Sequence, residues 1–250
     1  EEALAQAGEL DADPARRGTF IGTGVGGIQT LESQIEVRLE KGERRVSPFL
    51  VPMMMANAAA ATLSMRYGWQ GPCENTVTAC AAGTHAIGNG ARMIADGRCD
   101  AVLAGGSEAP FTPTAVAGFG NMTALSNSGV SRPFDANRDG FVMGEGAGAF
   151  VLEEWDMAVA RGATILGEIL GGGSNADAHH VTAPAPGGVG AIACMRLALD
   201  DAGLQPTDIR QINAHGTSTP LNDSAEAAAV AAVFGQHRVP VVSTKGVTGH

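Results

Sequence analysis

Cys80 has the sequence setting of a nucleophile. It follows a short β-prone run, Thr76–Thr78, and it precedes small residues that open a segment whose apolar positions have helical spacing. This pattern predicts that Cys80 lies at a tight turn between a strand and a helix. Unpaired backbone amides and the helix dipole favour a thiolate there. The alternative is a buried structural cysteine, the more common role of a single cysteine among alanines and glycines.

A second group of reactive side chains follows two predicted strands late in the chain. The strand at 209–213 leads into Ala-His215-Gly-Thr-Ser-Thr-Pro, and the strand at 239–243 leads into Thr-Lys245-Gly-Val-Thr-Gly-His250. Strand ends in α/β sheets are where reactive groups collect. A single histidine is more often structural, but two Gly-flanked histidines beside a reactive-looking cysteine favour a catalytic site.

The elements that must position these residues alternate between strand and helix, which predicts an α/β fold with buried sheets. The predicted strands lie at 18–22, 76–78, 100–105, 148–154, 165–171, 209–213 and 239–243. The predicted helices lie at 1–10, 31–41, 53–65, 80–96, 155–161 and 187–203, and a further helix begins at a capping box formed by Asp223 and Glu226.

Three further segments have a structural interpretation. The glycine-rich turn, residues 22–27, lacks the dinucleotide-binding spacing and predicts a tight turn with close backbone approach. The methionines of 53–65 are interpreted as core residues, and the alternative is that part of this segment lines a flexible apolar pocket. The segment 131–148 alternates acidic, arginine and glycine residues without the spacing of a calcium loop, so we expect a hydrogen-bonded structural loop.

Composition excludes several classes of function. The chain has 250 residues, of which 44% are hydrophobic, and a formal charge of −10, which argues against general nucleic-acid binding. Its four cysteines lack metal-ligand or disulfide spacing, so we expect no metal site and a reducing, cytoplasmic location. Without an apolar run of about 20 residues, no membrane-spanning segment is predicted.

The segments around Cys80, His215 and Lys245–His250 together resemble β-ketoacyl-acyl-carrier-protein synthases, the elongating condensing enzymes of fatty-acid synthesis. The glycine-rich turn and the segment 131–148 fit the same family. The resemblance covers nearly the whole chain in the right order and is nearest to the type II synthase that elongates longer acyl chains. It implies a thiolase-like α/β fold of two similar halves stacked in five layers, αβαβα, and a homodimer.

The same resemblance implies how the chain is organised. Residues 1–155 would form the N-terminal half with the nucleophile, and 156–250 would begin the C-terminal half with the histidine and lysine loops. The family extends beyond both ends of this sequence. We therefore expect the chain to be truncated, and unstable or inactive by itself.

The resemblance also implies a reaction. Cys80 would accept an acyl chain from the phosphopantetheine of an acyl carrier protein, and malonyl-carrier protein would then lose carbon dioxide and attack the thioester. His215 and His250 would donate N–H groups to the enolate oxygen, as in an oxyanion hole. Lys245 would supply positive charge. The product would be a 3-oxoacyl-carrier protein, and no separate cofactor is implied.

Five further residues match substrate-binding or docking positions of the family. Thr217 and Thr219 match hydroxyls that bind the pantetheine arm, and Val25 matches a position that borders the acyl pocket. Arg44 and Arg45 match a basic surface that would attract an acidic carrier protein, although simple solvation is the commoner role of adjacent surface arginines.

Alternative functions stay open from the sequence. A degradative thiolase would need a second catalytic cysteine, and a modular polyketide ketosynthase usually has Glu where this chain has Asn213. A type II polyketide ketosynthase shares the chemistry predicted here. A non-catalytic partner subunit, the chain-length factor, usually lacks the nucleophile, and an inert fragment is a further alternative.

Overall fold

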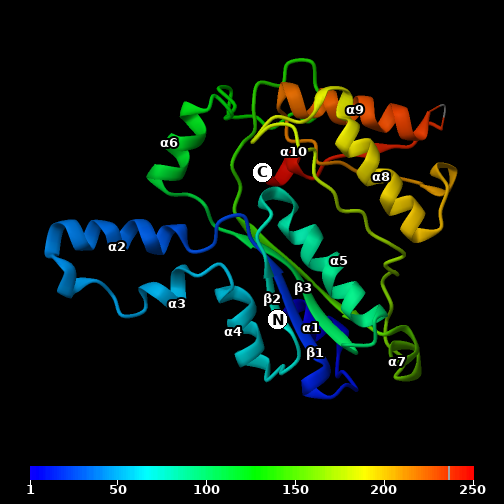
Figure 1. Cartoon of the computed structure of the whole chain (residues 1–250), viewed down its shortest axis with the longest axis horizontal. Coiled ribbons are helices and arrows are strands. Elements are labelled where there is room, and N and C mark those ends of the chain that lie inside the picture. The colour runs from blue at the N-terminus through cyan, green and yellow to red at the C-terminus, as the bar shows by residue number, and fades with distance from the viewer. Residues whose placement is uncertain (236) are drawn as a thin grey trace. The chain divides into compact units, whose positions relative to one another are not determined.

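The computed structural model describes residues 1–235 and 237–250, which form two compact units. Unit 1 comprises 1–112 and 145–169, and unit 2 comprises 113–144 and 170–250. The chain therefore leaves unit 1, returns to it and leaves it again. Within the described residues, no helix combines the length and the apolar character required to cross a bilayer. Both units mix helices and strands (Figure 1), as the sequence predicts.

Unit 1 is built on a four-stranded sheet of order β2-β1-β3-β4. Strands β1 (Arg17–Gly22), β2 (Cys73–Thr76) and β3 (Ala101–Glu108) are parallel, and β4 (Gly146–Glu153) is antiparallel to β3. The remaining elements are α1 (Glu2–Ala7), η1 (Pro14–Arg16), α2 (Ile28–Lys41), η2 (Glu43–Arg45), α3 (Leu50–Met54), α4 (Ala58–Tyr67), η3 (Ala79–Ala81), α5 (Ala82–Ala95) and α7 (Trp155–Ala160).

Helix α5 packs on strands β1 and β3 and makes the core of unit 1. Phe20, Val102 and Ala104 of the sheet are buried against Ala86 of the helix. Gly22, the last residue of β1, permits this packing at the site end of the sheet, because a Cβ there would lie 2.2 Å from the carbonyl oxygen of Ala82. The first turn of α5 is thus fixed directly against the carboxyl end of β1.

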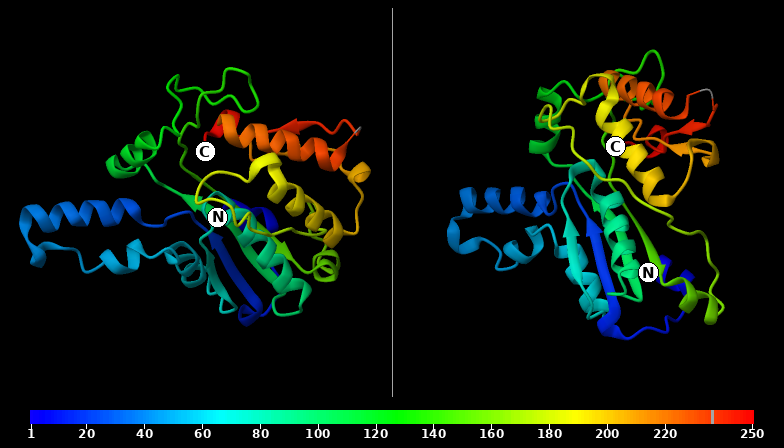
Figure 2. Two further views of the ribbon diagram at one scale, coloured as in Figure 1. Left: turned by 45° about the horizontal axis from the view of Figure 1, so that its top comes forward. Right: turned by 45° about the vertical axis from the view of Figure 1, so that its right-hand side comes forward.

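Unit 2 carries a short parallel pair of strands, β5 (Ile212–Asn213) and β6 (Val241–Val242). Its helices are α6 (Pro113–Asn121), α8 (Val189–Ala202), α9 (Pro220–Phe234) and α10 (Lys245–Thr248), with 3₁₀ turns η4 (Pro186–Gly188) and η5 (Pro206–Asp208). Helices α8 and α9 lie side by side, as the two views of Figure 2 also show. The strand pair ends where the loop of His215 and helix α10 begin.

The predicted helix at 53–65 is wrong in extent and in burial. Met55 adopts an extended backbone, with φ −63° and ψ 135°, and this separates α3 from α4. Its methionines are not core residues, since Met53 is 58% exposed and Met65 is 77% exposed. The alternative of a pocket lining fits better, because Met53 and Met55 line a cavity of unit 1. Helices α2 and α3 instead extend away from the sheet of unit 1 in Figures 1 and 2.

Two other elements differ from prediction. Residues 165–171 form no strand with any other described part of the chain, because an apolar β-prone run becomes a strand only beside a partner that accepts its hydrogen bonds. Helix α9 begins at Pro220 after Thr219, not at a capping box. The carboxylates of Asp223 and Glu226 bond to other backbone groups, so the predicted capping box is wrong.

Candidate functional site

Cys80 lies at a turn between strand and helix, as predicted. Strand β2 ends at Thr76, the 3₁₀ turn η3 spans Ala79–Ala81, and α5 begins at Ala82. Cys80 is exposed, which excludes the alternative of a buried structural cysteine. Its position directly before the first turn of a long helix is one in which amide groups and the helix dipole favour negative charge.

Local constraints hold this nucleophile turn, residues 78–81, in shape. Ala79 has a left-handed backbone with φ +49°, an unfavourable conformation for a residue with a Cβ. The N–H of Ala81 donates to the carbonyl oxygen of Thr78 at 3.1 Å, and the hydroxyl of Thr78 is 2.8 Å from Nδ1 of His85 on α5. The turn is therefore tied at its start to the helix that follows it.

His215 and His250 are neighbours within unit 2. Their ring centroids lie 5.2 Å apart, and the ring of Phe141 lies 5.2 Å from that of His250. Burial, with a smaller effect of the Lys245 charge, lowers the pKa of His215 to about 4. Burial, followed by His215 and Lys245, lowers the pKa of His250 to about 4. Both imidazoles are consequently neutral near pH 7.

The loop that carries His215 is fixed by helix α9. The N–H groups of His215 and Gly216 donate to the two carboxylate oxygens of Glu226, at 2.7 and 2.8 Å. On the other side, the hydroxyl of Ser243 donates to the carbonyl oxygen of Gly216 at 2.8 Å. Sequence reasoning missed this role of Glu226, because its spacing from Asp223 also matches a capping box.

Backbone pairing with the segment 131–148 fixes His250 and helix α10. The N–H of His250 donates to the carbonyl oxygen of Val142 at 2.7 Å, and Gly144 returns a bond to His250 at 2.8 Å. Ser131 donates its hydroxyl to the carbonyl oxygen of Lys245 at 2.6 Å. The prediction of a hydrogen-bonded structural loop is thus confirmed for residues 131–144, whereas residues 146–148 begin strand β4.

The same loop is held to the start of α9 by a buried carboxylate. Asp223 is 1% exposed, and its Oδ2 accepts from the N–H of Phe134 at 2.8 Å and lies 3.6 Å from Nε of Arg138. The hydroxyl of Ser218 accepts from the N–H of Arg132 at 2.9 Å. These bonds connect residues 131–144 of the segment to the loop of His215 within unit 2.

The other predicted site residues are divided between the two units. In unit 2, the hydroxyls of Thr217 and Thr219 are 2.8 Å apart, and Thr217 is buried. In unit 1, Val25 is 55% exposed on the glycine-rich turn, and Arg44 and Arg45 are exposed on η2. The structure thus groups the two histidines with Lys245 and the two threonines, whereas Cys80, Val25 and the arginines belong to unit 1.

The glycine-rich turn lies against the nucleophile turn inside unit 1. A Cβ added to Gly24 would be 3.7 Å from Cα of Ala79, the residue before Cys80. Close backbone approach at this turn is confirmed. Sequence reasoning missed its main contact, the carboxylate of Glu108. Glu108 is the last residue of β3, and an acidic residue at the end of a largely buried strand is a signal that could have found it.

The sequence matches two protein families over almost its whole length. Residues 1–158 match the β-ketoacyl synthase N-terminal domain, and residues 166–250 match the β-ketoacyl synthase C-terminal domain. The chain is 49% identical over 249 residues to the 3-oxoacyl-[acyl-carrier-protein] synthase 2 of Synechocystis sp., with 97% of this chain and 59% of the relative covered. It is 48% identical over 241 residues to the enzyme of that name from Staphylococcus aureus, with 94% and 60% covered.

Solved structures give the same result. A β-ketoacyl synthase from Burkholderia phymatum is 39% identical with a TM-score of 0.90, over 98% of this chain and 60% of that one. A type II polyketide ketosynthase in complex with its acyl-carrier protein is 34% identical with a TM-score of 0.92, over 96% and 62%. This chain spans about three fifths of the length of these relatives. With both of its parts matched in order, the chain belongs to the β-ketoacyl synthase family.

Proposed function

We propose that the full-length protein containing this chain condenses an acyl thioester with malonyl-acyl-carrier protein to give a 3-oxoacyl-carrier protein in fatty-acid elongation. The relatives named 3-oxoacyl-[acyl-carrier-protein] synthase support this reaction. The single observation that carries it is the neutral pair of imidazoles, His215 and His250, placed side by side.

The first half of the proposed reaction is acyl transfer to Cys80. The thiolate Sγ attacks the carbonyl carbon of the acyl thioester, the bond from that carbon to the pantetheine sulfur breaks, and the pantetheine thiol takes up a proton as it leaves. A cysteine suits this step because its thiolate is both a good nucleophile and a fair leaving group. Exposure of Cys80 at the start of α5 supports its assignment as the nucleophile.

The second half uses the histidine pair. Loss of carbon dioxide from the malonyl thioester leaves its electron pair on an enolate, whose oxygen His215 and His250 stabilise by N–H donation. The enolate carbon attacks the acyl carbonyl carbon, a carbon–carbon bond forms and the bond to Sγ of Cys80 breaks. Neutral imidazoles suit this role, because an imidazolium could protonate and quench the enolate. Lys245 helps to keep them neutral.

The remaining residues bind the substrates in this proposal. Thr217 and Thr219 hydrogen-bond the phosphopantetheine arm, and their paired hydroxyls lie in one loop after His215. Val25 borders the acyl pocket. Exposed Arg44 and Arg45 dock the acidic carrier protein. The reaction requires no metal and no cofactor beyond the phosphopantetheine of the carrier protein.

We further propose that the full-length protein is a cytoplasmic homodimer. Large apolar side chains are exposed on α2 and beside α3 in unit 1, with Leu39 72% exposed and Phe49 65% exposed. Burial of such side chains between two copies would remove apolar surface from water. Sedimentation of the full-length protein as a dimer, reduced to a monomer by Leu39→Glu with Phe49→Glu, tests this proposal.

Reconstitution tests the reaction. The full-length protein, acyl-carrier protein charged with a saturated acyl chain, and malonyl-carrier protein should yield carbon dioxide and the 3-oxoacyl-carrier protein in equal amounts. Mass spectrometry before malonyl-carrier protein is added should show the acyl group on the peptide that contains Cys80. Product formation without any acyl-enzyme, or none in the presence of all substrates, would contradict the proposal.

A type II polyketide ketosynthase is the second candidate, favoured by the structural similarity to a polyketide ketosynthase with its acyl-carrier protein. The two functions differ in what happens after one condensation. A polyketide enzyme extends the unreduced 3-oxoacyl product again, whereas a fatty-acid enzyme requires reduction first. Incubation with excess malonyl-carrier protein and no reductase should stop at one condensation, and longer polyketide chains would favour the second candidate.

A further inference from the structure

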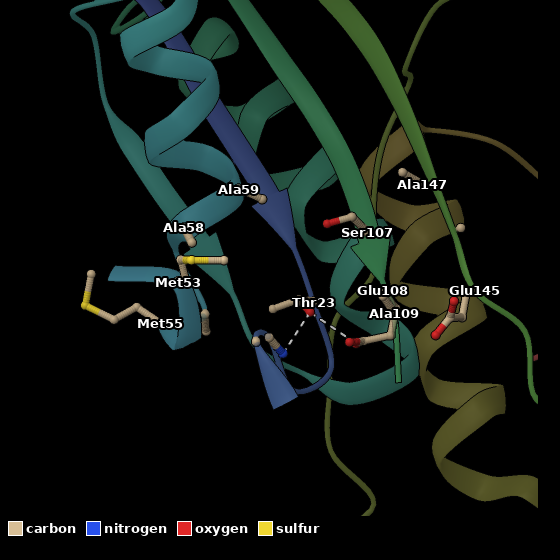
Figure 3. Close-up of a pocket in the computed structure, with 14 residues that line it drawn as sticks. Thr23, Met53, Met55, Ala58, Ala59, Ser107, Glu108, Ala109, Glu145 and Ala147 are labelled. Atoms are coloured by element: carbon tan, nitrogen blue, oxygen red, sulfur yellow. Dashed lines mark hydrogen bonds between the residues drawn. The ribbon is translucent and has the colours of Figure 1, made fainter. Parts of the chain in front are cut away.

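Glu108, the last residue of β3, organises the glycine-rich turn. Its Oε2 accepts hydrogen bonds from the hydroxyl of Thr23 at 3.1 Å, from the N–H of Val25 at 3.2 Å and from the N–H of Gly24. The hydroxyl oxygen of Thr23 in turn accepts from the N–H of Gly26 at 3.1 Å. One carboxylate oxygen therefore holds three consecutive residues of the turn directly and a fourth, Gly26, through Thr23. Figure 3 shows Glu108 pointing toward Thr23.

This contact requires a glycine at position 24. A Cβ there would lie 2.7 Å from Oε2 of Glu108, so a larger residue would displace the carboxylate from this position. The same Cβ would be 3.7 Å from Cα of Ala79, so Gly24 lies between the carboxylate and the nucleophile turn. Glu108 thus bonds to the glycine-rich turn, which in turn lies against the nucleophile turn.

The two carboxylate oxygens of Glu108 differ in their hydrogen bonds. Oε2 accepts from the glycine-rich turn. The second oxygen, Oε1, is buried and accepts no hydrogen bond from the described residues. The side chain forms part of the wall of a cavity of about 520 Å³, which Thr23, Met53 and Glu145 also line (Figure 3). A buried carboxylate oxygen without a donor is costly. The hydrogen bonds of the other oxygen, Oε2, all go to the glycine-rich turn.

Val25 depends on this carboxylate for its position. Its side chain is 55% exposed and so is not fixed by surrounding core residues. Its backbone N–H is held by Glu108, and its neighbours Gly24 and Gly26 are held directly and through Thr23. Hydrogen bonds to an ionised acceptor are roughly twice as strong as neutral ones. The hydrogen bonds of Glu108 to the turn therefore constrain the Val25 backbone, and with it the position of the Val25 side chain.

We propose that Glu108 is a positioning residue that sets the place of Val25 and thereby the length of acyl chain that the enzyme accepts. This inference rests on the proposed function, in which Val25 borders the acyl pocket. Glu108 touches no reacting atom in this role. It acts through the glycine-rich turn, and its removal should alter the choice between acyl chains more than the reactivity of Cys80.

The test compares Glu108→Gln with Glu145→Gln in the full-length protein. Gln keeps the size of the side chain but replaces the charged acceptor with a neutral one. Glu145 is a matched control because it lines the same cavity, while its Oε1 accepts from the N–H of Phe111 at 2.8 Å and from Gln29 at 3.4 Å, outside the glycine-rich turn. The readouts are kcat/KM for short and long acyl thioesters, and the rate of Cys80 alkylation by iodoacetamide.

For Glu108→Gln, the ratio of kcat/KM between long and short acyl chains should change about tenfold, a size typical of altered apolar pockets. Cys80 alkylation should stay within about twofold of the wild-type rate, and Glu145→Gln should retain the wild-type ratio. Thr23→Val, which removes one hydroxyl at nearly constant volume, should shift the ratio in the same direction. It also serves as the test if Glu108→Gln does not fold.

An unchanged ratio in a folded variant would overturn the inference, as would an equal change in Glu145→Gln. A uniform fall for all chain lengths together with slower Cys80 alkylation would also overturn it, because that result indicates general support of the fold. If the wild-type protein condenses no acyl chain of any length, the proposed function fails and this inference fails with it. Normal wild-type condensation with an unchanged ratio would reject the inference alone.

Discussion

The imidazole rings of His215 and His250 meet edge to face, with their planes inclined at 71°. His215 follows strand β5 and His250 follows helix α10. The pair therefore brings together two parts of the chain that are 35 residues apart in the sequence. The ring centroids are 5.2 Å apart. Two positive charges at this distance would repel by about 3 kcal/mol at an effective dielectric of about 20. The pair therefore favours the neutral state, and this has consequences for both stability and activity.

Stability should fall as acid protonates the pair. The pKa of each histidine is about 4 in the folded protein, against 6.5 normally, so the unfolded chain binds more protons between these values. The stabilising contribution is complete above pH 6.5 and is lost as the pH falls toward 4, by up to about 3 kcal/mol for one histidine. Urea unfolding across this range should show that loss, and His215→Asn should show a smaller slope. Parallel slopes for the two proteins would contradict the prediction.

Loss of either imidazole should slow condensation more than acyl transfer. His215→Ala and His250→Ala should each lower the condensation rate about a hundred- to a thousandfold, the usual effect of removing one oxyanion donor. Formation of the acyl-enzyme on Cys80 should decrease much less. His179→Ala is the control, because His179 is exposed on a loop of the same unit. A variant that condenses at the wild-type rate would contradict the assigned role.

Cys80→Ala should abolish the acyl-enzyme and reduce condensation by at least about a thousandfold, since the covalent step depends on this thiolate. Mass spectrometry of the protein after incubation with acyl-carrier protein measures the first effect directly. Cys73 offers a matched control, because it is also an exposed cysteine in unit 1. Cys73→Ala should keep both activities, and acylation that persists in Cys80→Ala would assign the nucleophile elsewhere.

Charge reversal at Arg44 and Arg45 should weaken binding of the acyl-carrier protein. Opposite charges on exposed surfaces attract more strongly at low salt, so the difference in Kd from wild type should shrink as salt is added. Titration calorimetry or fluorescence anisotropy at two salt concentrations measures it. Arg98→Glu, an exposed arginine elsewhere in unit 1, is the control. Equal Kd values at low salt would show that the two arginines are only solvated.

Asp223→Ala should destabilise unit 2 without touching the nucleophile. The carboxylate side chain is fully buried, and its loss leaves the N–H of Phe134 and the guanidinium of Arg138 without this acceptor. Breaking such a buried pair costs about 3–5 kcal/mol. Chemical denaturation should show a loss of this order. Asp200→Ala, at an exposed acid on α8, should change stability by less than about 0.5 kcal/mol.

The sequence predicted the elements whose signals are local. Cys80 at a turn before a helix and the tight turn at 22–27 follow from glycine positions and apolar spacing. The structural loop follows from alternating acidic, arginine and glycine residues. The structure confirms both turns, and it confirms the loop over residues 131–144. The missed features depend on tertiary partners. Residues 165–171 have a strand-like composition, but no strand lies beside them in the described structure. The methionines of 53–65 have a helical pattern, but this pattern does not show whether another element of the protein buries them.

The roles of three carboxylates depend on contacts with distant parts of the chain. Asp223 and Glu226 have the spacing of a capping box, but both reach away from the start of α9 toward backbone groups of other loops. Glu108 gave no sequence prediction, since its three donors come from a turn about 84 positions earlier. A carboxylate that binds distant N–H groups leaves no periodic pattern, and only the folded chain identifies what it positions.

Unit 2 is built from two separate segments of the chain, so it can be completed only after the second segment has been synthesised. Residues 113–144 belong with the C-terminal part of the chain, and the bond from Phe134 to Asp223 spans 89 positions. At about 5–20 residues per second, the ribosome supplies Asp223 some 4–18 s after Phe134. For that interval residues 113–144 have been synthesised but Asp223, their partner, has not. Translation speed over residues 144–223, and chaperones that bind nascent chains, therefore act on the part of the protein that fixes His250.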